Sequence, residues 1–322
     1  MILSMLAISV GHRVSLALRM SKYQRDSLRA LYLAKAGINR AIVELENDLT
    51  NPNTKDYDAL NETWSYSEDI FKEIRLTDNE NEYAQVSYDF GESKNPQTRF
   101  GVIDEESKIN INTASQEVLV ELLKVSGIDD VRAQELAADI PKWRGSLDLD
   151  QDTAKFYEDN LGYPCKKEKF AVLEELILVR GMKEIEAGKL EKIKSLITAY
   201  SDDKVNINTA SGQVLRVLGL AAASNLGISE ADVGALVGNI LSFRSKENGY
   251  FKSTDIGTIK VMLGLDDNQT NIIRCLIGWG VLSVVSSNFR IDATGNVGRV
   301  TKRITAIIKR GNPIEVVYWH EG

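Results

Sequence analysis

The segment Lys108-Ile-Asn-Ile-Asn-Thr-Ala-Ser115 decides the fold, because the chain contains it twice. It returns as Lys204-Val-Asn-Ile-Asn-Thr-Ala-Ser211. When the comparison is extended to Leu119 and Leu215, nine of the twelve aligned positions are identical. The alternating aliphatic residues of each copy favour a short, half-buried extended segment, and an apolar helical pattern follows each copy.

Each copy also contains the residue that we expect to begin a helix. Thr113 and Thr209 stand where a hydroxyl would accept hydrogen bonds from the free N–H groups of a helix N-terminus. Gln116 completes the spacing of a capping box in the first copy only. A repeated passage from an extended segment into a helix predicts two similar helical lobes in one chain.

A shorter period runs through both lobes. An apolar helix, a glycine followed by an apolar residue and another helix recur four times, at Gly127-Ile128, Gly181-Met182, Gly227-Ile228 and Gly264-Leu265. This is the helix–hairpin–helix pattern, with two hairpins in each lobe. We therefore expect lobe 1 at residues 104–200 and lobe 2 at residues 201–280.

The composition bounds the function classes. A length of 322 residues fits about two domains, and 43% apolar with 26% charged residues describes an ordinary globular chain. The net charge of −7 argues against nucleic acid as the default partner, since phosphate binding needs a basic face. The two histidines, His12 and His320, lie at opposite ends of the chain. No phosphate loop or catalytic triad pattern is present, so the sequence does not predict an enzyme.

A long helix is predicted over residues 1–50. Residues 1–10 are uncharged and mostly apolar, about half of what spans a bilayer. They are the start of a buried helix, a signal-peptide core, or the remaining half of a membrane helix. Further along, apolar residues recur every three or four positions, at Leu28, Leu31, Ala34, Ile38, Ile42, Leu45 and Leu49. The first part of the helix is thus apolar throughout and the second part amphipathic.

Strand patterns flank the lobes on both sides. Segments rich in β-branched and aromatic residues occur at 82–90 and 98–103 before the lobes, and at 281–285, 288–291, 297–309 and 314–319 after them. Gly311-Asn312-Pro313 is typical of a hairpin turn. We therefore predict one sheet formed from residues 51–103 and 281–322, interrupted by the helical insertion.

An acidic cluster lies inside lobe 1. Its members are Asp148, Asp150, Asp152, Glu158 and Asp159. Alternate aspartates followed by a further carboxylate resemble the ligand spacing of a calcium loop. Thr153 stands where such loops usually have a sharp-turn glycine, and the alternative is a solvated acidic loop.

The two cysteines are too few for a disulfide scaffold. Cys165 and Cys275 fall in different lobes. They would pair in an oxidising compartment, or remain two buried free thiols.

Helix–hairpin–helix units also occur in proteins that bind nucleic acid. That use favours a second glycine close behind the first, which lets the backbone approach a phosphate. The residues at that place are Asp129, Lys183, Ser229 and Asp266, and residues 104–150 contain eleven acids and five bases. We therefore expect no nucleic-acid binding.

Several segments carry a family resemblance, in the same order along the whole chain. Tyr32-Leu-Ala-Lys-Ala-Gly-Ile38, in its long helix, resembles the pilin and pseudopilin helix. The repeated segments, together with Glu174-Glu-Leu-Ile-Leu-Val-Arg-Gly-Met182 and Ser287-Asn-Phe-Arg-Ile291, resemble the K-type minor pseudopilins of type II secretion systems (general secretion pathway protein K).

The resemblance implies an α+β fold: a pilin-like long N-terminal helix and antiparallel sheet, with a large inserted all-α domain of two helix–hairpin–helix (SAM-like) lobes. It implies a non-enzymatic subunit at the tip of the pseudopilus, acting in protein export across the outer membrane. The helix would be a single-pass inner-membrane anchor with the head in the periplasm. Its membrane part is expected to be truncated in this numbering, because a leader and processing site are lacking.

The resemblance also implies partners. These are the I- and J-type minor pseudopilins, the pseudopilus and a secreted protein. We expect the pseudopilins to meet the helix face formed by Leu28, Leu31, Ile38, Ile42 and Leu45. The alternative is a membrane-tethered helix–hairpin–helix DNA-binding protein of the competence type.

Family members further carry an acidic segment linked to calcium after a Trp-Arg pair, here Trp143-Arg144. That segment matches Asp148, Asp150 and Asp152. The chain departs from the family at Thr153-Ala154-Lys155, where the family tends to show Gly-Ala-Glu.

Overall fold

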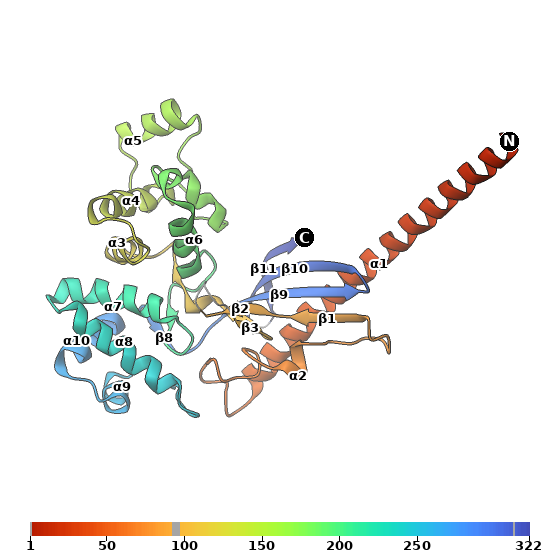
Figure 1. The fold of residues 1–322 in the computed structure, drawn as a ribbon. Helices are drawn as coiled ribbons and strands as arrows, with labels where there is room; N and C mark the ends of the chain where they lie inside the picture. The colour runs from red at the N-terminus through yellow and green to blue at the C-terminus, as the bar shows by residue number, and fades with distance from the viewer. Residues whose placement is uncertain (1, 92–96, 312) are drawn as a thin grey trace. The chain divides into compact units, whose positions relative to one another are not determined.

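The computed structural model describes residues 2–91, 97–311 and 313–322, which form two compact units (Figure 1). The first unit, here called the head, comprises Met1–Lys55, Leu60–Ile103 and Phe289–Gly322. The second, the helical unit, comprises Asp56–Ala59 and Asp104–Asn288. The chain therefore leaves the head, builds the helical unit and returns.

The head is built on one continuous helix, α1 (Ile2–Thr50). At 1.5 Å per residue its length is roughly 70 Å. The second half of α1 covers the sheet of the head, and the first half extends past the sheet (Figure 1). The buried face of the second half consists of Ala30, Leu33, Ala34, Ile38, Ala41 and Leu45. Steps of three and four residues place all of these on one side of the helix.

Small residues let α1 approach the sheet closely. A Cβ atom added to Gly295 would lie 1.9 Å from the carbonyl oxygen of Ala30. A Cβ atom added to Gly37 would lie 3.1 Å from the Cβ of Ala293. A side chain at Gly295 would therefore push the helix off the strand.

The main sheet of the head has the order β1 (Glu82–Val86), β9 (Asn288–Val297), β10 (Val300–Lys309) and β11 (Glu315–Glu321), with β4 (Ile103–Asp104) also paired to β9. β1 is antiparallel to β9, and β10 is antiparallel to β11. β1 precedes the helical insertion and β9 follows it, so the prediction of one sheet made from both flanks is confirmed.

Smaller elements complete the head. They are α2 (Glu68–Phe71) and the two-stranded ribbon of β2 (Tyr88–Phe90) and β3 (Gln97–Arg99). The pattern at 82–90 is thus divided between two sheets at Ser87. Residues 92–96, and Asn312 of the predicted hairpin turn, lie outside the described residues.

The helical unit contains both predicted lobes. Lobe 1 holds η1 (Glu105–Ser107), β5 (Ile109–Asn110), α3 (Gln116–Val125), α4 (Asp130–Trp143), α5 (Gln151–Phe156), η2 (Tyr157–Leu161), η3 (Leu173–Leu178), η4 (Met182–Glu184), α6 (Ala187–Leu196) and β6 (Ile197–Thr198). Lobe 2 holds β7 (Val205–Asn206), α7 (Gly212–Leu226), α8 (Glu230–Arg244), α9 (Ile256–Leu263), α10 (Asp267–Gly278) and β8 (Leu282–Ser283). One continuous apolar core runs through the two lobes.

Each lobe is closed by a short parallel strand pair. β5 pairs with β6, and β7 pairs with β8. The prediction that residues 281–285 belong to the sheet of the head is therefore wrong. The N–H of Val205 donates to Val281, and the N–H of Ile207 donates to Ser283, so the second copy of the repeated segment takes this strand as its partner.

All four hairpin glycines have positive φ, between 63° and 92°. Glycine adopts this conformation without steric cost, which explains its presence at each turn. In the second hairpin the helices next to Gly181 are short 3₁₀ helices, η3 and η4, rather than α-helices.

The positions of the helix caps differ from the prediction. Ser115 and Ser211 begin α3 and α7, and their hydroxyls accept hydrogen bonds from the N–H groups of Val118 and Val214. Each helix therefore starts two residues later than expected. Gln116 becomes its first residue and cannot close a capping box.

Candidate functional site

The first half of α1 is a long apolar surface that the head does not cover. Met5, Ile8, Val10, Val14, Leu16, Leu18 and Met20 are all more than half exposed, with Ile8 at 72%. These side chains point in all directions around the helix, because they follow no single three- or four-residue step. Although Arg13 and Arg19 interrupt it, an exposed surface this rich in apolar residues marks an interaction with another protein or a membrane.

A helix that spans a bilayer needs roughly 20 apolar residues, which sets a requirement for the helices of this chain. Within the described part of the chain, none combines the length and the uninterrupted apolar character that a membrane span requires.

The fold buries most of the expected partner face and leaves one of its residues exposed. Ile38 and Leu45 are 1% and 0% exposed in the core of the head, which corrects the expectation that they face another subunit. Leu31 and Ile42 are partly buried against the same core, and only Leu28 is exposed. The regular apolar stripe predicts a partner face, but in the structure it is the side of the helix that packs on its own sheet.

A different stripe of α1 remains open. Leu28, Tyr32 and Val43 are exposed, Tyr32 by 69%. Steps of four and eleven residues bring them to one side of an α-helix. Tyr32 was quoted for its family resemblance and not for its exposure. The signal for this face was the set of apolar residues left over once the buried stripe was complete.

The carboxylates of the acidic cluster in lobe 1 do not converge on a common point. Asp150 begins α5, and its carboxylate accepts hydrogen bonds from Thr153 N at 2.7 Å and from Lys142 Nζ at 2.7 Å. The Lys142 ammonium holds the pKa of Asp150 well below its usual value. Asp148 precedes this cap, whereas Glu158 and Asp159 lie in η2.

This arrangement does not fit a calcium ion. Within the described residues, no three of the five predicted carboxylates bring oxygens close enough to share one ion. An ion at Asp150 would also have to displace Lys142. Calcium binding by this loop therefore stays a prediction from the sequence.

A buried carboxyl cluster was not recognised in the sequence. Asp104 Oδ2 accepts hydrogen bonds from Thr209 Oγ1 at 2.5 Å and from Ser286 Oγ at 2.7 Å. Burial, and next the Glu106 carboxylate, raise the pKa of Asp104 well above its ordinary value. The acids in front of the first repeated segment were the available signal, but sequence alone does not show that they turn inward.

The other members of this cluster have equally defined partners. Glu106 accepts hydrogen bonds from the backbone N–H of Asn288 at 3.0 Å and from its Nδ2 at 2.8 Å. Glu105 accepts one from Thr198 Oγ1 and forms an ion pair with Lys108. These carboxyls join the entry of lobe 1 to lobe 2 and to the end of the insertion. Their role is structural.

Three of the four hairpin tips are closed to phosphate. Asp129, Ser229 and Asp266 are the caps of α4, α8 and α10, and each side chain accepts a hydrogen bond from the first turn of its helix. A phosphate at a helix N-terminus would need those same N–H groups. An acidic cap also repels it.

Both cysteines are free thiols. Cys165 is buried in lobe 1, and its Sγ lies 3.7 Å from the Lys142 carbonyl oxygen. Cys275 lies in α10 of lobe 2. Burial raises the pKa of both thiols, so neither is an activated nucleophile.

A long N-terminal helix packed on an antiparallel sheet, with a large helical insertion, is a pilin-like α+β fold, as predicted. The chain is similar to a chain of the crystal structure of the GspK-GspI-GspJ complex from the enterotoxigenic Escherichia coli type 2 secretion system. The likeness has a TM-score of 0.63 at 16% sequence identity and covers 95% of this chain and 99% of the other. At that identity it shows the shared fold.

No protein-family model and no curated protein sequence matches the chain.

Proposed function

We propose that this chain is a K-type minor pseudopilin of a type II secretion system. The observation that carries the proposal is structural likeness over nearly the whole length of both chains to a chain of the GspK-GspI-GspJ complex. The motifs quoted from the sequence point to the same family independently. The chain would act without catalysis, as a subunit of the machinery that exports proteins across the outer membrane.

The proposed partners are the I- and J-type minor pseudopilins. The structure offers two surfaces for them on α1: its open apolar first half, and the stripe of Leu28, Tyr32 and Val43. Helices pack through such stripes when ridges of side chains enter grooves of a neighbour. The first half of α1 would also be the single-pass anchor in the inner membrane, with the head in the periplasm.

We further propose that the subunit caps the pseudopilus tip. Filament growth by a heterologous contact requires every subunit to offer the same two faces. The helical unit contains more residues than the head that carries it. Such a mass repeated at every step would crowd the next subunit, whereas one copy at the end meets no neighbour beyond it.

Reconstitution with the I- and J-type pseudopilins of the same system tests this proposal. Native mass spectrometry should find one copy of each chain in the complex. Tyr32→Asp should weaken assembly more than tenfold, because a charge would be buried in the contact. Val261→Asp, at an exposed apolar position of α9, is the matched control and should leave assembly unchanged. Many copies of this chain along the filament shaft would refute the tip role.

The competence-type alternative predicts DNA binding. We expect none at physiological salt, because acidic and serine caps occupy the hairpin N-termini. Fluorescence anisotropy with duplex and single-stranded DNA checks this. Micromolar affinity that falls steeply with added salt would favour the alternative instead.

A further inference from the structure

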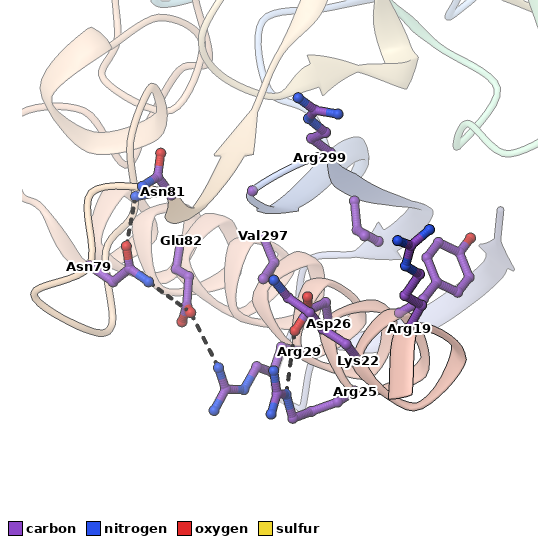
Figure 2. Close-up of a pocket in the computed structure, with 13 residues that line it drawn as sticks. Arg19, Lys22, Arg25, Asp26, Arg29, Asn79, Asn81, Glu82, Val297 and Arg299 are labelled. Carbon is purple, nitrogen blue, oxygen red and sulfur yellow. Dashed lines mark hydrogen bonds and ion pairs between the residues drawn. The ribbon is translucent and has the colours of Figure 1, made fainter. Parts of the chain in front are cut away.

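An open hollow of about 520 Å³ lies in the head, beside the middle of α1. Its walls come from three segments: α1 between Arg19 and Arg29, the loop from Asn79 to Glu82 that leads into β1, and the turn at Val297–Val300 between β9 and β10 (Figure 2). All three belong to the head, so the hollow is part of one compact unit.

The hollow is strongly cationic in an acidic chain. Its charged residues are Arg19, Lys22, Arg25, Arg29 and Arg299 against Asp26 and Glu82. The four cations of α1 recur at steps of three and four residues, which stacks like charges along one helix side. Like charges at this spacing destabilise a helix unless a counter-charge is present.

The two acids are already engaged. Arg25 Nε lies 3.4 Å from Asp26 Oδ1, and Arg29 Nη1 lies 3.3 Å from Glu82 Oε1. Glu82 Oε1 also accepts a hydrogen bond from Asn79 Nδ2 at 3.0 Å. Figure 2 shows these contacts as dashed lines.

Three cations remain without an acidic partner. Among the described residues, Arg19, Lys22 and Arg299 form no ion pair with a carboxylate, and all three are exposed. The hollow therefore has an uncompensated positive charge from two different structural elements, the helix and the β9–β10 turn. An anion there would be bound by arginines that present fixed forks of N–H donors, a geometry that suits phosphate oxygens.

The surroundings of the hollow indicate whether the phosphate would belong to a lipid or to a soluble molecule. N-terminal to the hollow, α1 presents exposed apolar residues between Met5 and Leu18, interrupted at His12 and Arg13. A ligand that covers both surfaces has a phosphate at one end and a hydrocarbon chain at the other. A soluble phosphate satisfies only the first surface.

We propose that this hollow binds the phosphate of an anionic phospholipid, whose acyl chains lie along the first half of α1. The inference rests on the membrane anchoring that belongs to the proposed function. The head would thereby sit at the membrane surface in a fixed orientation while the subunit waits to be assembled. Arg299 would contribute to that orientation, because it lies on the β9–β10 turn and not on the helix.

Vesicle flotation of the full chain tests the proposal. Vesicles of phosphatidylcholine alone are compared with vesicles in which about a third of the lipid is phosphatidylglycerol. We expect tighter binding to the second kind, reduced about fivefold in Arg299→Gln, since one cation near an anionic surface contributes by that order. Arg303→Gln on β10 removes the same charge from the same unit outside the hollow, and should change binding less than twofold.

Three results would overturn the proposal. Equal losses in Arg299→Gln and Arg303→Gln would mean diffuse charge attraction without a site. Displacement from vesicles by inorganic phosphate, but not by chloride at the same ionic strength, would make soluble phosphate the ligand. Loss of assembly with the I- and J-type pseudopilins in Arg299→Gln, with vesicle binding intact, would assign the hollow to a protein partner.

The outcome is separable from that of the proposed function. If the wild-type chain fails to assemble with those pseudopilins yet keeps its Arg299-dependent lipid preference, the family assignment fails and the lipid site stands.

Discussion

The two lobes of the helical unit contain nearly the same segment, and they use its asparagines in the same way. Asn112 Oδ1 accepts a hydrogen bond from Phe170 N at 2.7 Å, and Asn112 Nδ2 donates to the Phe170 carbonyl oxygen at 3.1 Å. Asn208 makes the same pair of bonds to Phe251, at 2.7 and 2.9 Å. In each lobe one amide thus satisfies both backbone groups of a buried phenylalanine that lies far along the chain.

An arginine outside the segment completes each copy. Arg144 donates to the carbonyl oxygens of Ile111 and Ala114. Arg244 donates to those of Ile207 and Ala210. Desolvation lowers the pKa of both guanidinium groups, that of Arg244 to about 10. The structural repeat is therefore a hydrogen-bonding unit made of the segment, a phenylalanine and an arginine. It includes more residues than the identical segment that the sequence shows.

The lobes differ at the threonine of the segment. Thr113 is exposed, whereas Thr209 is buried and donates to Asp104. The same residue in the same local structure thus has different partners, because only the second copy lies against the carboxyl cluster. Residues whose partners lie inside the repeat keep their role, and a residue that points out of it takes its role from its surroundings.

The largest expected effect comes from removing a shared amide. Asn208→Ala leaves the N–H and the carbonyl oxygen of Phe251 buried without partners, at a cost of about 2–4 kcal/mol in unfolding free energy. Asn112→Ala also removes a third hydrogen bond, from Asn112 Nδ2 to the Ala199 carbonyl oxygen at 3.2 Å. It should still cost less, because Asn112 is 9% exposed and Asn208 only 1%, so water can replace part of what is lost at the first site. Urea unfolding followed by circular dichroism measures both. Equal costs would show that burial does not distinguish the lobes.

The second effect is a pH dependence of the unfolding free energy. It arises at the carboxyl cluster, which only the second copy of the segment contacts. Asp104 has a raised pKa in the folded chain, so it holds its proton more tightly there than in the unfolded chain. Its contribution to stability is complete below the unfolded pKa, about 4, and is lost as the pH rises through the folded pKa. Thermal melts from pH 5 upward should show falling stability, and Asp104→Asn should flatten that fall. A slope unchanged by Asp104→Asn would contradict this assignment.

Much of this architecture was predictable because it rests on local patterns. The repeat, the hairpin glycines and the strands on both flanks each follow from a short period in the sequence. The long helix followed from apolar steps of three and four residues. These signals depend on residues close in the chain, which a sequence displays directly.

Apart from the two-residue shift of the helix caps, which is local, the errors have one cause: burial depends on distant residues. The stripe through Ile38 and Leu45 fits a partner as well as it fits the chain's own sheet, and only the folded positions of β1, β9 and β10 decide between the two. Asp104 and Glu106 look like a solvated acidic run until Ser286 and Asn288, far along the chain, supply their hydrogen-bond donors. The prediction that Leu282 belongs to the sheet of the head was wrong because a strand pattern does not identify the strand with which it pairs.

The third effect tests the threonine difference directly. Thr209→Val keeps the shape of the side chain but removes the hydroxyl that donates to Asp104, and should cost about 1–2 kcal/mol. Thr113→Val, at the exposed equivalent, should change stability by less than about 0.5 kcal/mol. Urea midpoints of the two variants give the comparison. A cost at Thr113 as large as at Thr209 would mean that the hydroxyl acts within the repeat itself.

The smallest expected effect concerns the acidic loop that lobe 1 has and lobe 2 lacks. Calcium there must compete with Lys142 for Asp150, whose carboxylate already caps α5. Stabilisation by a ligand grows only with its free concentration relative to its dissociation constant, and is about 0.4 kcal/mol when the two are equal. Melts with one millimolar calcium and with chelator should therefore nearly overlap for the wild-type chain.

Lys142→Ala sharpens that test, because it frees Asp150 while leaving the acidic loop intact. The separation between the calcium and chelator melts should grow in this variant and vanish again when Asp150→Asn is added. Asp150→Asn alone is the matched control, since asparagine still caps a helix well and removes only the charge. A calcium stabilisation of several kcal/mol in the wild-type chain, lost in Asp150→Asn, would show that the loop rearranges around the ion and that the sequence prediction was right. The same stabilisation surviving Asp150→Asn would place the ion elsewhere in the molecule.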